Sequence, residues 1–486
     1  MKYVLLKISV FLTIAAFSQT NSASLTTGQY GDGPDSIAPV GVKKGLADEQ
    51  LMETVQKQTF RFFWHGAHPH SGLALERSNT VLAEHYWDYI NEAWDQPNFS
   101  TTEFGPDAGA IGGTGFGIMA TIVAVNRGWI GRDTAVRRLI QIADFLANAD
   151  CFHGIYPHFM NARTGKTIKF DRIDDAADIV ETSYLLMGFL CAREFFNKNI
   201  PREEYLRMRI TKMWNAANWR WHTNGEHKLY WHWSPNNGFD MNFPVWGWNE
   251  CLITYIMAAS SPWPHKAIDK SAYDGTWAGS NSFKNGKTYY GYLLPLGNYD
   301  EDKGGPLFFE QYTFQGIDPT GLTDTLQIDY FLQAKNHTLI NRAYCIENPL
   351  KYKGYSEKVW GLTAGDSYIG YVAHSTHPQN DKGVIQPTAA ISSMPFTPKE
   401  SMEAMRYFYE VLGSKIWGKY GFIDGFSIHH NWYAKSYIAI DEGPIINMIE
   451  NYRTGLLWKL FMQIPDIQQG LKKLGFNSPY FKKKDN

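Results

Sequence analysis

The stretch DRIDDAADIVETSYLLMGFLC, residues 171–191, decides the fold of this chain because it joins a cluster of acids directly to a run of apolar residues. The apolar part is hydrophobic on nearly every side, which is typical of a helix enclosed by other helices. If the helix begins near Asp174, then Asp174, Asp178 and Glu181 share one face, because they are spaced four and three residues apart. The stretch therefore predicts a buried helix with an acidic mouth at one end of the core.

Three acids on one helical face need a reason. Like charges four residues apart destabilise an isolated helix by about 0.2 to 0.5 kcal/mol per pair, and the helix dipole offsets only the first turn. Such a row suits the binding of polyols, cations or protons. The alternative is that these acids are ordinary partners of the dipole at a helix N-terminus. Both interpretations are open at this point.

The length and charge of the chain favour one large domain of nearly neutral charge. The chain has 486 residues and no long linker rich in Pro, Ser or Gly, so a single core is expected. Its 46 Lys and Arg residues balance 48 Asp and Glu residues, and no basic block points to nucleic acid. The unusual feature is the aromatic content of 17 Trp, 28 Tyr and 29 Phe, which either fill a core or form stacking platforms.

The N-terminal residues have the pattern of an export signal. Residues 1–22, MKYVLLKISVFLTIAAFSQTNS, combine two lysines with an apolar stretch that ends in small residues, as in a secretory signal peptide. Residues 23–45 are rich in Ser, Thr, Gly and Pro and predict an extended leader. No later segment is apolar over about 18 residues, the length that a membrane span needs. We therefore expect a periplasmic or secreted protein with no membrane span, and a monomer.

Apolar periodicity predicts many helices and few strands. The expected helices alternate between nearly all-apolar and amphipathic types, and the chain has no sequence repeats. Thr397 and Glu400 form a capping-box pattern, and Gly443-Pro444 is expected to open the last long helix, which ends before Pro465. The alternation predicts concentric inner and outer helices. The expected helices span residues 48–64, 115–126, 133–148, 174–191, 201–218, 251–259, 328–344, 397–412 and 443–464.

Several motifs that would indicate a cofactor fail on inspection. Gly165-Lys166-Thr167 lacks the first glycine of a phosphate loop, because Met160 stands there. The acids of residues 171–178 lack the glycine and the closing glutamate of a calcium loop. His65, His68 and His70 lie in a loop that favours no metal site. The four cysteines are widely spaced in apolar contexts and predict buried thiols. We expect no metal and no cofactor.

Carboxylates and aromatic rings remain as the chemistry of the chain. Seven aromatic residues fall within residues 230–248, in a turn-rich loop that ends at Glu250. Sugar rings stack on indoles through their apolar faces, although the alternative is that about half of these Trp side chains fill the core. Glycosidases need two carboxyl groups that face one bond, one protonated and one ionised. The candidate carboxyls are Asp174, Asp178, Glu181, Glu250, Asp441 and Glu442.

Seven stretches give the chain a family resemblance over about residues 46–465. They are TFRFFWHGAHPHSGLALERS (59–78), GGTGFGIMA (112–120), DIVETSYLLMGFL (178–190), WGWNE (246–250), WGLTAGDS (360–367), PTAAISSMPFTPKESMEAMRYFY (387–409) and IAIDEGPIINMIENYRTGLLWKLF (438–461). The chain resembles the bacterial glucoamylase-like family, whose characterised members include endo-β-1,2-glucanases with an (α/α)6 barrel.

The resemblance implies an all-α fold, an (α/α)6 barrel with long aromatic-rich loops and minor β-hairpins. The catalytic domain would span residues 46–470, with a C-terminal tail at 471–486. It also implies that Glu250 and Asp441 are the catalytic carboxyls and that the three acids of the first stretch line the cleft. Gly365 and Glu442 depart from the residues expected at their positions, which leaves endo or exo action open.

The residues themselves suggest the division of labour. Glu250 follows Trp246 and Trp248, an apolar setting that raises a carboxyl pKa and suits a general acid. Asp441 stands at the start of the last long helix, where the dipole favours the ionised form that a general base needs. The predicted substrate contacts are Asp174, Asp178, Glu181, Trp231, Trp233, Trp246 and Glu442.

The carboxyls and rings predict a glycoside hydrolase, and the resemblance implies that it cleaves a glucan, β-1,2-glucan or its oligosaccharides, by an inverting acid and base mechanism. One alternative is a glycan-binding protein without catalysis. Another is a polysaccharide lyase, since helical barrels also carry that chemistry. A lyase needs Arg or Lys to hold a uronate, and an acidic cleft would repel that substrate.

Overall fold

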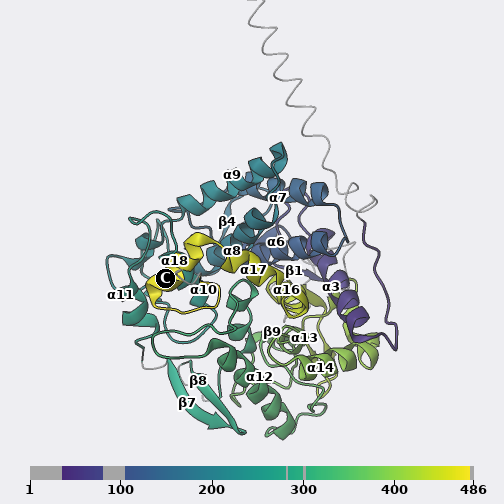
Figure 1. The fold of residues 1–486 in the computed structure, drawn as a ribbon. Helices are drawn as coiled ribbons and strands as arrows, with labels where there is room; N and C mark the ends of the chain where they lie inside the picture. The colour runs from purple at the N-terminus through teal and green to yellow at the C-terminus, as the bar shows by residue number, and fades with distance from the viewer. Residues whose placement is uncertain (1–35, 80–103, 281–282, 299–302, 482–486) are drawn as a thin grey trace, which may run out of the picture.

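The computed structural model describes residues 36–79, 104–280, 283–298 and 303–481 (Figure 1). The predicted signal peptide and most of the predicted leader lie outside these ranges. From Ser36 to Ala47 the chain has no helix or strand, and Val40 N donates to Gln58 Oε1 at 3.0 Å. The last part of the predicted leader therefore lies against the first helix of the fold.

The centre of the molecule is made of helices that are buried on nearly all sides. These inner helices contain many apolar and small residues, as the all-apolar periodicity predicts. In the middle of Figure 1 they lie close together, and α6 packs against both α8 and α16. The inner helices are α6 (Ile111–Asn126), α8 (Ile179–Phe195), α10 (Leu252–Ala259), α13 (Pro387–Ile391) and α16 (Ala439–Thr454).

A second set of helices covers the first and buries one face only. Along the chain the two sets alternate, so that each outer helix leads to an inner one (Figure 1). The short helices η4 (Leu307–Glu310) and η5 (Thr313–Gln315) lie between α10 and α13 in sequence, and η5 packs against α16. This is the predicted (α/α)6 barrel. The outer helices are α3 (Asp48–Trp64), α7 (Arg132–Leu146), α9 (Pro201–Ala216), α12 (Tyr330–Glu347) and α14 (Pro398–Glu410).

Two helices follow the barrel at the C-terminal end of the chain. Helix α17 (Leu456–Met462) and helix α18 (Pro465–Leu474) cross the barrel in yellow in Figure 1, and α18 packs on α10. Leu471, Leu474 and Phe476 are buried. The predicted boundary between catalytic domain and tail at residue 470 is therefore wrong, because it falls inside α18.

Short antiparallel strand pairs connect the helices. The pair β1 (Arg77–Asn79) and β15 (Ser436–Ile438) connects the segment after the first barrel helix to the segment before the last one, with Arg77 opposite Ile438. The pair β5 (Ala177–Asp178) and β6 (His232–Trp233) joins the start of α8 to the aromatic loop. The other strands are β2 (Ala108–Ala110), β3 (Phe159–Asn161), β4 (Thr167–Ile168), β7 (Lys284–Tyr289), β8 (Tyr292–Leu296), β9 (Ala364–Ser367), β10 (Gly370–Ala373), β11 (Trp417–Gly418), β12 (Gly421–Phe422), β13 (Phe426–Ser427) and β14 (Trp432–Tyr433).

Helix α8 begins five residues later than the sequence predicts. Asp178 is the N-cap residue, with extended backbone angles, and its Oδ1 accepts from the amides of Val180 and Glu181 at 2.8 and 3.0 Å. The helix begins there because the Asp178 side chain accepts hydrogen bonds from these two amides, which would otherwise have no acceptor. The prediction that Asp174, Asp178 and Glu181 share one helical face is therefore wrong.

Helix α16 also differs from its prediction. It begins at Ala439, so that Pro444 lies inside the helix rather than at its start, and it ends at Thr454, before the cap residue Gly455, whose φ is 66°. The Ala439 amide donates to Glu76 O at 2.9 Å, which fixes the start of the helix beside β1. Asp441 consequently lies in the first helical turn, and residues 443–464 form two helices rather than one.

Smaller predictions divide between confirmed and wrong. Helix α14 begins at Pro398 as predicted, but the Thr397 hydroxyl bonds to Ser393 and Ser401 instead of closing a capping box. All four cysteines are free thiols; three are buried, whereas Cys151 is exposed. Among the residues that the structure describes, no helix is both long and apolar enough to cross a membrane.

Candidate active site

A cavity of 460 Å³ opens at the mouths of the inner helices. Its volume lies in the range of small-molecule sites. The walls combine carboxyl groups, aromatic rings and one arginine, which is the composition expected for binding a sugar. The lining residues include Glu76, Arg77, His158, Phe170, Glu181, Tyr184, Trp231, Glu250, Phe308, Tyr312 and Tyr371.

A larger open cavity of 690 Å³ lies between α7 and the β3–β4 hairpin. Arg137, Arg163 and Arg202 line it, and Asp144 is the one acid among its described lining residues. Because a glycosidase needs two carboxyl groups, the smaller cavity is the candidate active site.

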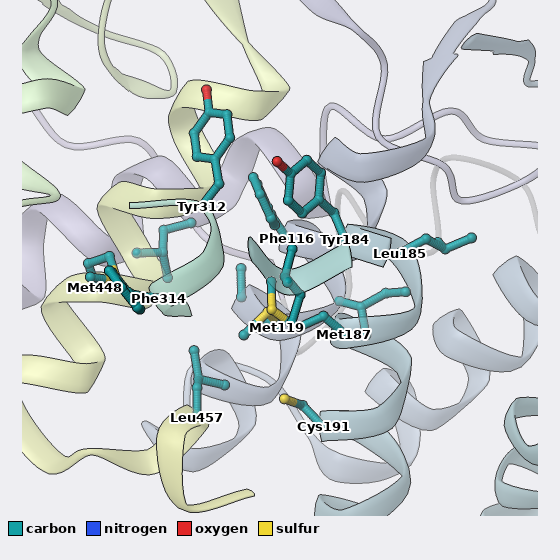
Figure 2. Close-up of a cluster of buried hydrophobic side chains, with 14 of the residues drawn as sticks. Phe116, Met119, Tyr184, Leu185, Met187, Cys191, Tyr312, Phe314, Met448 and Leu457 are labelled. Carbon is teal, nitrogen blue, oxygen red and sulfur yellow. The ribbon is translucent and has the colours of Figure 1, made fainter. Parts of the chain in front are cut away.

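Two tyrosines form the floor of the candidate site. Tyr184 and Tyr312 both pack against Phe116, with ring centroids at 5.2 and 5.4 Å. Figure 2 shows their hydroxyl groups pointing the same way, away from Met119 and Cys191 in the apolar core. The rings therefore seal the core below the cavity and present two polar groups to it.

Each of these phenols lies against one of the two predicted catalytic residues. The Tyr184 hydroxyl donates to the backbone oxygen of Glu250 at 3.4 Å, and the Tyr312 hydroxyl donates to Asp441 Oδ1 at 3.5 Å. Tyr184 and Tyr312 are themselves adjacent, with ring centroids 5.8 Å apart. Glu250 and Asp441, which are far apart in the sequence, thus meet around the same cavity floor.

Glu250 stands at the cavity wall, just before α10. Its Oε2 atom is buried without a hydrogen-bond donor, and its backbone oxygen accepts from Thr313 Oγ1 at 2.7 Å. Burial raises the pKa of Glu250 to about 7, the direction that the sequence predicts. The predicted cause is only partly right, because Trp248 donates to Glu310 at 2.7 Å and Trp246 is 39% exposed.

Asp441 lies behind Tyr312, and only 2% of it is exposed. Burial raises the pKa of Asp441 to about 7, with Glu442 and Asp366 adding to the rise while hydrogen bonds from Asp424 and Tyr312 oppose it. The prediction that the start of the helix holds Asp441 ionised is therefore wrong in direction. A dipole contribution of about 0.3 to 1 kcal/mol is too small to offset the burial of a carboxylate.

Of the three acids at the α8 mouth, Glu181 alone lines the cavity. Its Oε2 accepts from the Gly112 amide at 2.8 Å, and an added Cβ at Gly112 would stand 2.5 Å from that oxygen. Burial raises the pKa of Glu181 to about 7, and nearby Asp178 and Asp174 raise it further although His158 lowers it. Glu181 is thus a third carboxyl, after Glu250 and Asp441, that can hold a proton near neutral pH.

Asp178 and Asp174 lie behind the cavity wall. Asp178 is fully buried, and its Oδ2 accepts from His158 Nδ1 at 3.0 Å and from Trp231 Nε1 at 3.1 Å. Asp174 Oδ1 lies 3.1 Å from His232 Nδ1. The two contacts of Asp178 anchor groups that do line the cavity, the His158 ring and the Trp231 indole. Direct contact of either acid with a substrate stays a prediction.

His158 is the cation of this region. Burial alone would lower its pKa, but Glu181, Asp178 and Asp174 together raise the pKa of His158 to about 9. One ligand atom from each of His158, Asp174 and Asp178 lies within 4.8 Å of the others, so the three could surround a metal ion. Because imidazole binds a metal only in its neutral form, an ion there would have to displace the His158 proton.

The predicted aromatic platforms do not all lie at the cavity. Trp231 lines it and stacks on Phe243, with ring centroids at 5.4 Å and planes 27° apart. Trp233 instead packs against Trp221 and His153, and neither Trp233 nor Trp246 is among the lining residues. Their contact with a substrate stays a prediction.

The sequence interpretation missed a charged group on the opposite wall. Arg77 donates through Nη1 to both oxygens of Asp366, at 2.8 and 2.7 Å, and through Nε to Glu76 at 3.0 and 2.8 Å. Charged residues inside the otherwise apolar stretches 59–78 and 360–367 were the available indication. The β1–β15 pair and the β9 strand bring them together, and neither pairing is visible in local sequence.

Two further acids, Asp424 and Glu442, lie deeper. Burial raises the pKa of both groups well above the ordinary value, and neither lines the cavity. The unexpected Gly365 has a local reason: a Cβ there would stand 2.7 Å from Gln386 Cγ and 2.9 Å from Asp424 Oδ2. Only a residue without a side chain leaves room for this carboxyl.

The chain is similar to several known proteins. The Glycoamylase family model, described as "Putative glucoamylase", matches residues 242–465. An exo β-1,2-glucooligosaccharide sophorohydrolase (non-reducing end) from Parabacteroides distasonis is 39% identical over 450 residues, which are 88% of this chain. The chain spans 58% of the length of that relative.

Two solved structures are similar over nearly the whole chain. A "putative glucoamylase" from Bacteroides uniformis is 52% identical, with a TM-score of 0.83, and the match covers 90% of this chain and 100% of that one. An endo-β-1,2-glucanase from Chitinophaga pinensis, in complex with sophorotriose and glucose, is 46% identical, with a TM-score of 0.83 and the same coverage of 90% and 100%.

Proposed function

The chain belongs to the glucoamylase-like family of glycoside hydrolases, and from that premise we propose that it is an exported enzyme that cleaves β-1,2-glucan or its oligosaccharides with inversion. One observation carries the proposal. Glu250 lines the cavity and Asp441 lies directly behind Tyr312 at its floor, each carboxyl residue beside a phenol, and burial raises the pKa of both to about 7. Two carboxyls that titrate near neutral pH can be divided into one acid and one base.

Glu250 is the general acid in this proposal, because it lines the cavity and burial favours its protonated form. It gives its proton to the glycosidic oxygen as the bond from that oxygen to the anomeric carbon breaks. Asp441 is the general base and takes a proton from the water that attacks the same carbon from the opposite face. One water is consumed, and the two carboxyls end with exchanged protonation. Inverting enzymes hold these groups about 6.5 to 9.5 Å apart to leave room for the water.

The remaining walls would hold the sugar. The Trp231 indole, held by Asp178, offers a flat face for a sugar ring. Glu181 and the Glu76–Arg77 pair offer charged partners for hydroxyl groups, and such bonds contribute about 1.5 to 3 kcal/mol each. Asp178 would act by positioning His158 and Trp231, and Asp174 through its contact with His232. A linkage of β-1,2 type is proposed because the named relatives act on it.

The cavity is a poor site for a lyase. Among the described lining residues Arg77 is the only arginine or lysine, and its guanidinium already pairs with Glu76 and Asp366. The other cation of the lining, His158, pairs with Asp178, so neither cation is left to hold a uronate carboxylate.

A substrate panel tests the proposal. The wild type and Glu250→Gln are incubated with linear β-1,2-glucan, starch and a uronate polymer, and both reducing ends and the absorbance of unsaturated products are followed. We expect the wild type alone to release reducing ends, from β-1,2-glucan alone. Sophorose as the sole early product would indicate exo action, whereas a ladder of longer fragments would indicate endo action. Unsaturated products would support the lyase, and binding without any products would support the glycan-binding alternative.

Export is a separate part of the proposal, motivated by residues 1–22. The mature N-terminus should lie between about residues 17 and 25. N-terminal sequencing of protein recovered from the periplasm or medium checks this. A cytoplasmic protein that starts at Met1 would contradict it.

A further inference from the structure

Asp424 is a buried carboxyl that the proposed reaction does not use. It lies between β12 and β13, with 3% of its surface exposed. Its Oδ2 accepts from the Asp366 amide at 2.6 Å, and its own amide donates to Ser436 O at 2.9 Å. These contacts hold the carboxyl near Asp441, and each of the two carboxyls shifts the pKa of the other.

Each of the two carboxyls has one oxygen atom that lacks a hydrogen-bond donor among the described residues. Asp424 Oδ1 and Asp441 Oδ2 are both buried without a hydrogen-bond donor from any residue that the structure describes. Two carboxylates cannot satisfy each other, because ionised carboxyl oxygens only accept hydrogen bonds. A single proton held between the pair satisfies both atoms, as in other carboxyl pairs that share one site.

The surrounding charges also require a proton in this place. The groups that face the pair are Asp366, Glu442, Glu76 and Arg77, together with the phenols of Tyr312 and Tyr371. Arg77 is the one permanent cation among them, and it already forms ion pairs with Glu76 and Asp366. Asp424 and Asp441 therefore share a buried region in which no cation remains to balance two negative charges.

We propose that Asp424 is a positioning residue that keeps its proton and donates it in a hydrogen bond to Asp441. Each carboxyl accepts one bond from elsewhere, Asp441 from Tyr312 and Asp424 from the Asp366 amide. The proton belongs on Asp424 because Asp441 lies in the first turn of α16, where the helix dipole favours the ionised form of the two. Asp424 thus lets the base ionise at a lower pH than an isolated buried aspartate would. This inference rests on the proposed role of Asp441 as the general base.

Two substitutions separate this role from a structural one. In Asp424→Asn the amide oxygen can accept from the Asp366 amide, while the amide NH2 donates to Asp441 as the protonated carboxyl does. In Asp424→Ala that donor is lost. The readout is the acid limb of the pH profile of kcat/KM on β-1,2-gluco-oligosaccharides. We expect Asp424→Asn to keep the acid limb at the wild-type pH, and Asp424→Ala to move it up by about one pH unit or more.

Opposite results overturn the inference. If Asp424→Asn loses activity at every pH, Asp424 acts as a carboxylate rather than as a donor. If Asp424→Ala leaves the acid limb in place, Asp424 does not influence Asp441. Melting curves of both variants show whether each is folded, and if the Ala variant is not, Asp424→Asn and the following measurement decide.

Infrared difference spectroscopy reads the proton without a substrate. At pH 7 the wild type minus Asp424→Asn should show the carbonyl band of one protonated carboxyl, whereas a carboxylate band in its place would overturn the inference. This result stands even if the wild type cleaves no β-1,2-glucan, an outcome that would refute the proposed function alone.

Discussion

The mouths of helices α8 and α16 solve the same electrostatic problem in different ways. Both place buried acids in or beside the first turn of an inner helix. At α8 the acids have cations and donors: Asp178 binds His158, Trp231 and two amides. At α16 the acids outnumber the one arginine, Arg77, which pairs with Asp366. Asp441 and Asp424 do not pair with this arginine and interact with each other instead.

The titration of the two groups follows from this difference. Although burial would raise the pKa of Asp178, its hydrogen bond to His158 and its cationic neighbours lower it below the ordinary range. Burial raises the pKa of Asp441 to about 7. A helix N-terminus is common to both, so it does not decide the charge state. The partners of a buried carboxyl decide whether it becomes a fixed anion or a group that can exchange protons.

The largest expected effect concerns the two carboxyls that can exchange protons. Glu250→Gln and Asp441→Asn each remove one proton transfer and should lower turnover by about a hundredfold or more. Initial rates on β-1,2-glucan, with melting curves as the control for folding, check this. A fully active Asp441→Asn would mean that Glu181 or Glu442 is the base. The α16 mouth would then no longer differ from the α8 mouth by holding the proton-exchanging aspartate.

The fixed anion at α8 should matter first for stability. Asp178→Ala removes both the cap of α8 and the partner of His158, and we expect a loss of about 1 to 3 kcal/mol at pH 7. Because the pKa of Asp178 is lowered in the folded protein, its contribution is present above the pKa of the unfolded chain and is lost as the pH falls. Urea unfolding at pH 7 and at pH 4 measures both parts.

Asp178→Asn is the matched control for the same residue. Its amide oxygen can still cap α8, but the charge that holds the His158 proton is gone. NMR titration should show the pKa of His158 falling from its value near 9. An unchanged pKa of His158 would mean that Glu181 and Asp174 alone maintain it.

A smaller effect is expected for the indole that Asp178 anchors. Trp231→Ala should weaken the binding of β-1,2-gluco-oligosaccharides by about 1 kcal/mol, roughly fivefold in Kd. Trp246→Ala is the matched comparison, since Trp246 is not among the cavity-lining residues. Calorimetry on the Glu250→Gln background avoids turnover. Equal losses for both variants would place Trp246 in the substrate path as well, as the sequence predicts.

The smallest effect concerns Glu442, whose Oε2 atom is buried without a hydrogen-bond donor among the described residues. Burial raises its pKa well above the ordinary value, so the folded protein binds a proton that the unfolded chain releases above about pH 4.3. Stability from this group is present below that pH and is lost as the pH rises. Glu442→Gln should therefore melt like the wild type near pH 4 and at a higher temperature at pH 8. A lower melting temperature at pH 8 would show that the Glu442 charge is needed.

Much of the barrel could be predicted because burial leaves a trace in local sequence. Helices such as α6 and α8 are apolar on every side, whereas α7 and α9 carry one apolar stripe, so inner and outer positions can be told apart. Helix starts were less predictable. Asp178 is both the last residue of β5 and the N-cap of α8, and Pro444 lies inside α16. The rules for the start of an isolated helix therefore misplace both helix starts.

The site divides in the same way. Glu250, Glu181 and Trp231 could be found because acids and rings cluster along the chain. Arg77, Asp366 and Asp424 could not, because strand pairs between distant segments bring them to Asp441. The direction of the Asp441 pKa shift was missed because it depends on burial and on Asp424, Asp366 and Tyr312, which come from three other segments.

The stereochemistry of cleavage tests the central claim most directly, namely that Glu250 and Asp441 act on opposite faces of one glycosidic bond. Proton NMR of a fresh reaction of the wild type with β-1,2-glucan, recorded before the products mutarotate, identifies the anomer at the new reducing end. Inversion of a β bond predicts the α-anomer first, with the β-anomer appearing later. If the β-anomer appears first, the configuration is retained, and the assignment of Asp441 as a base that activates water is wrong.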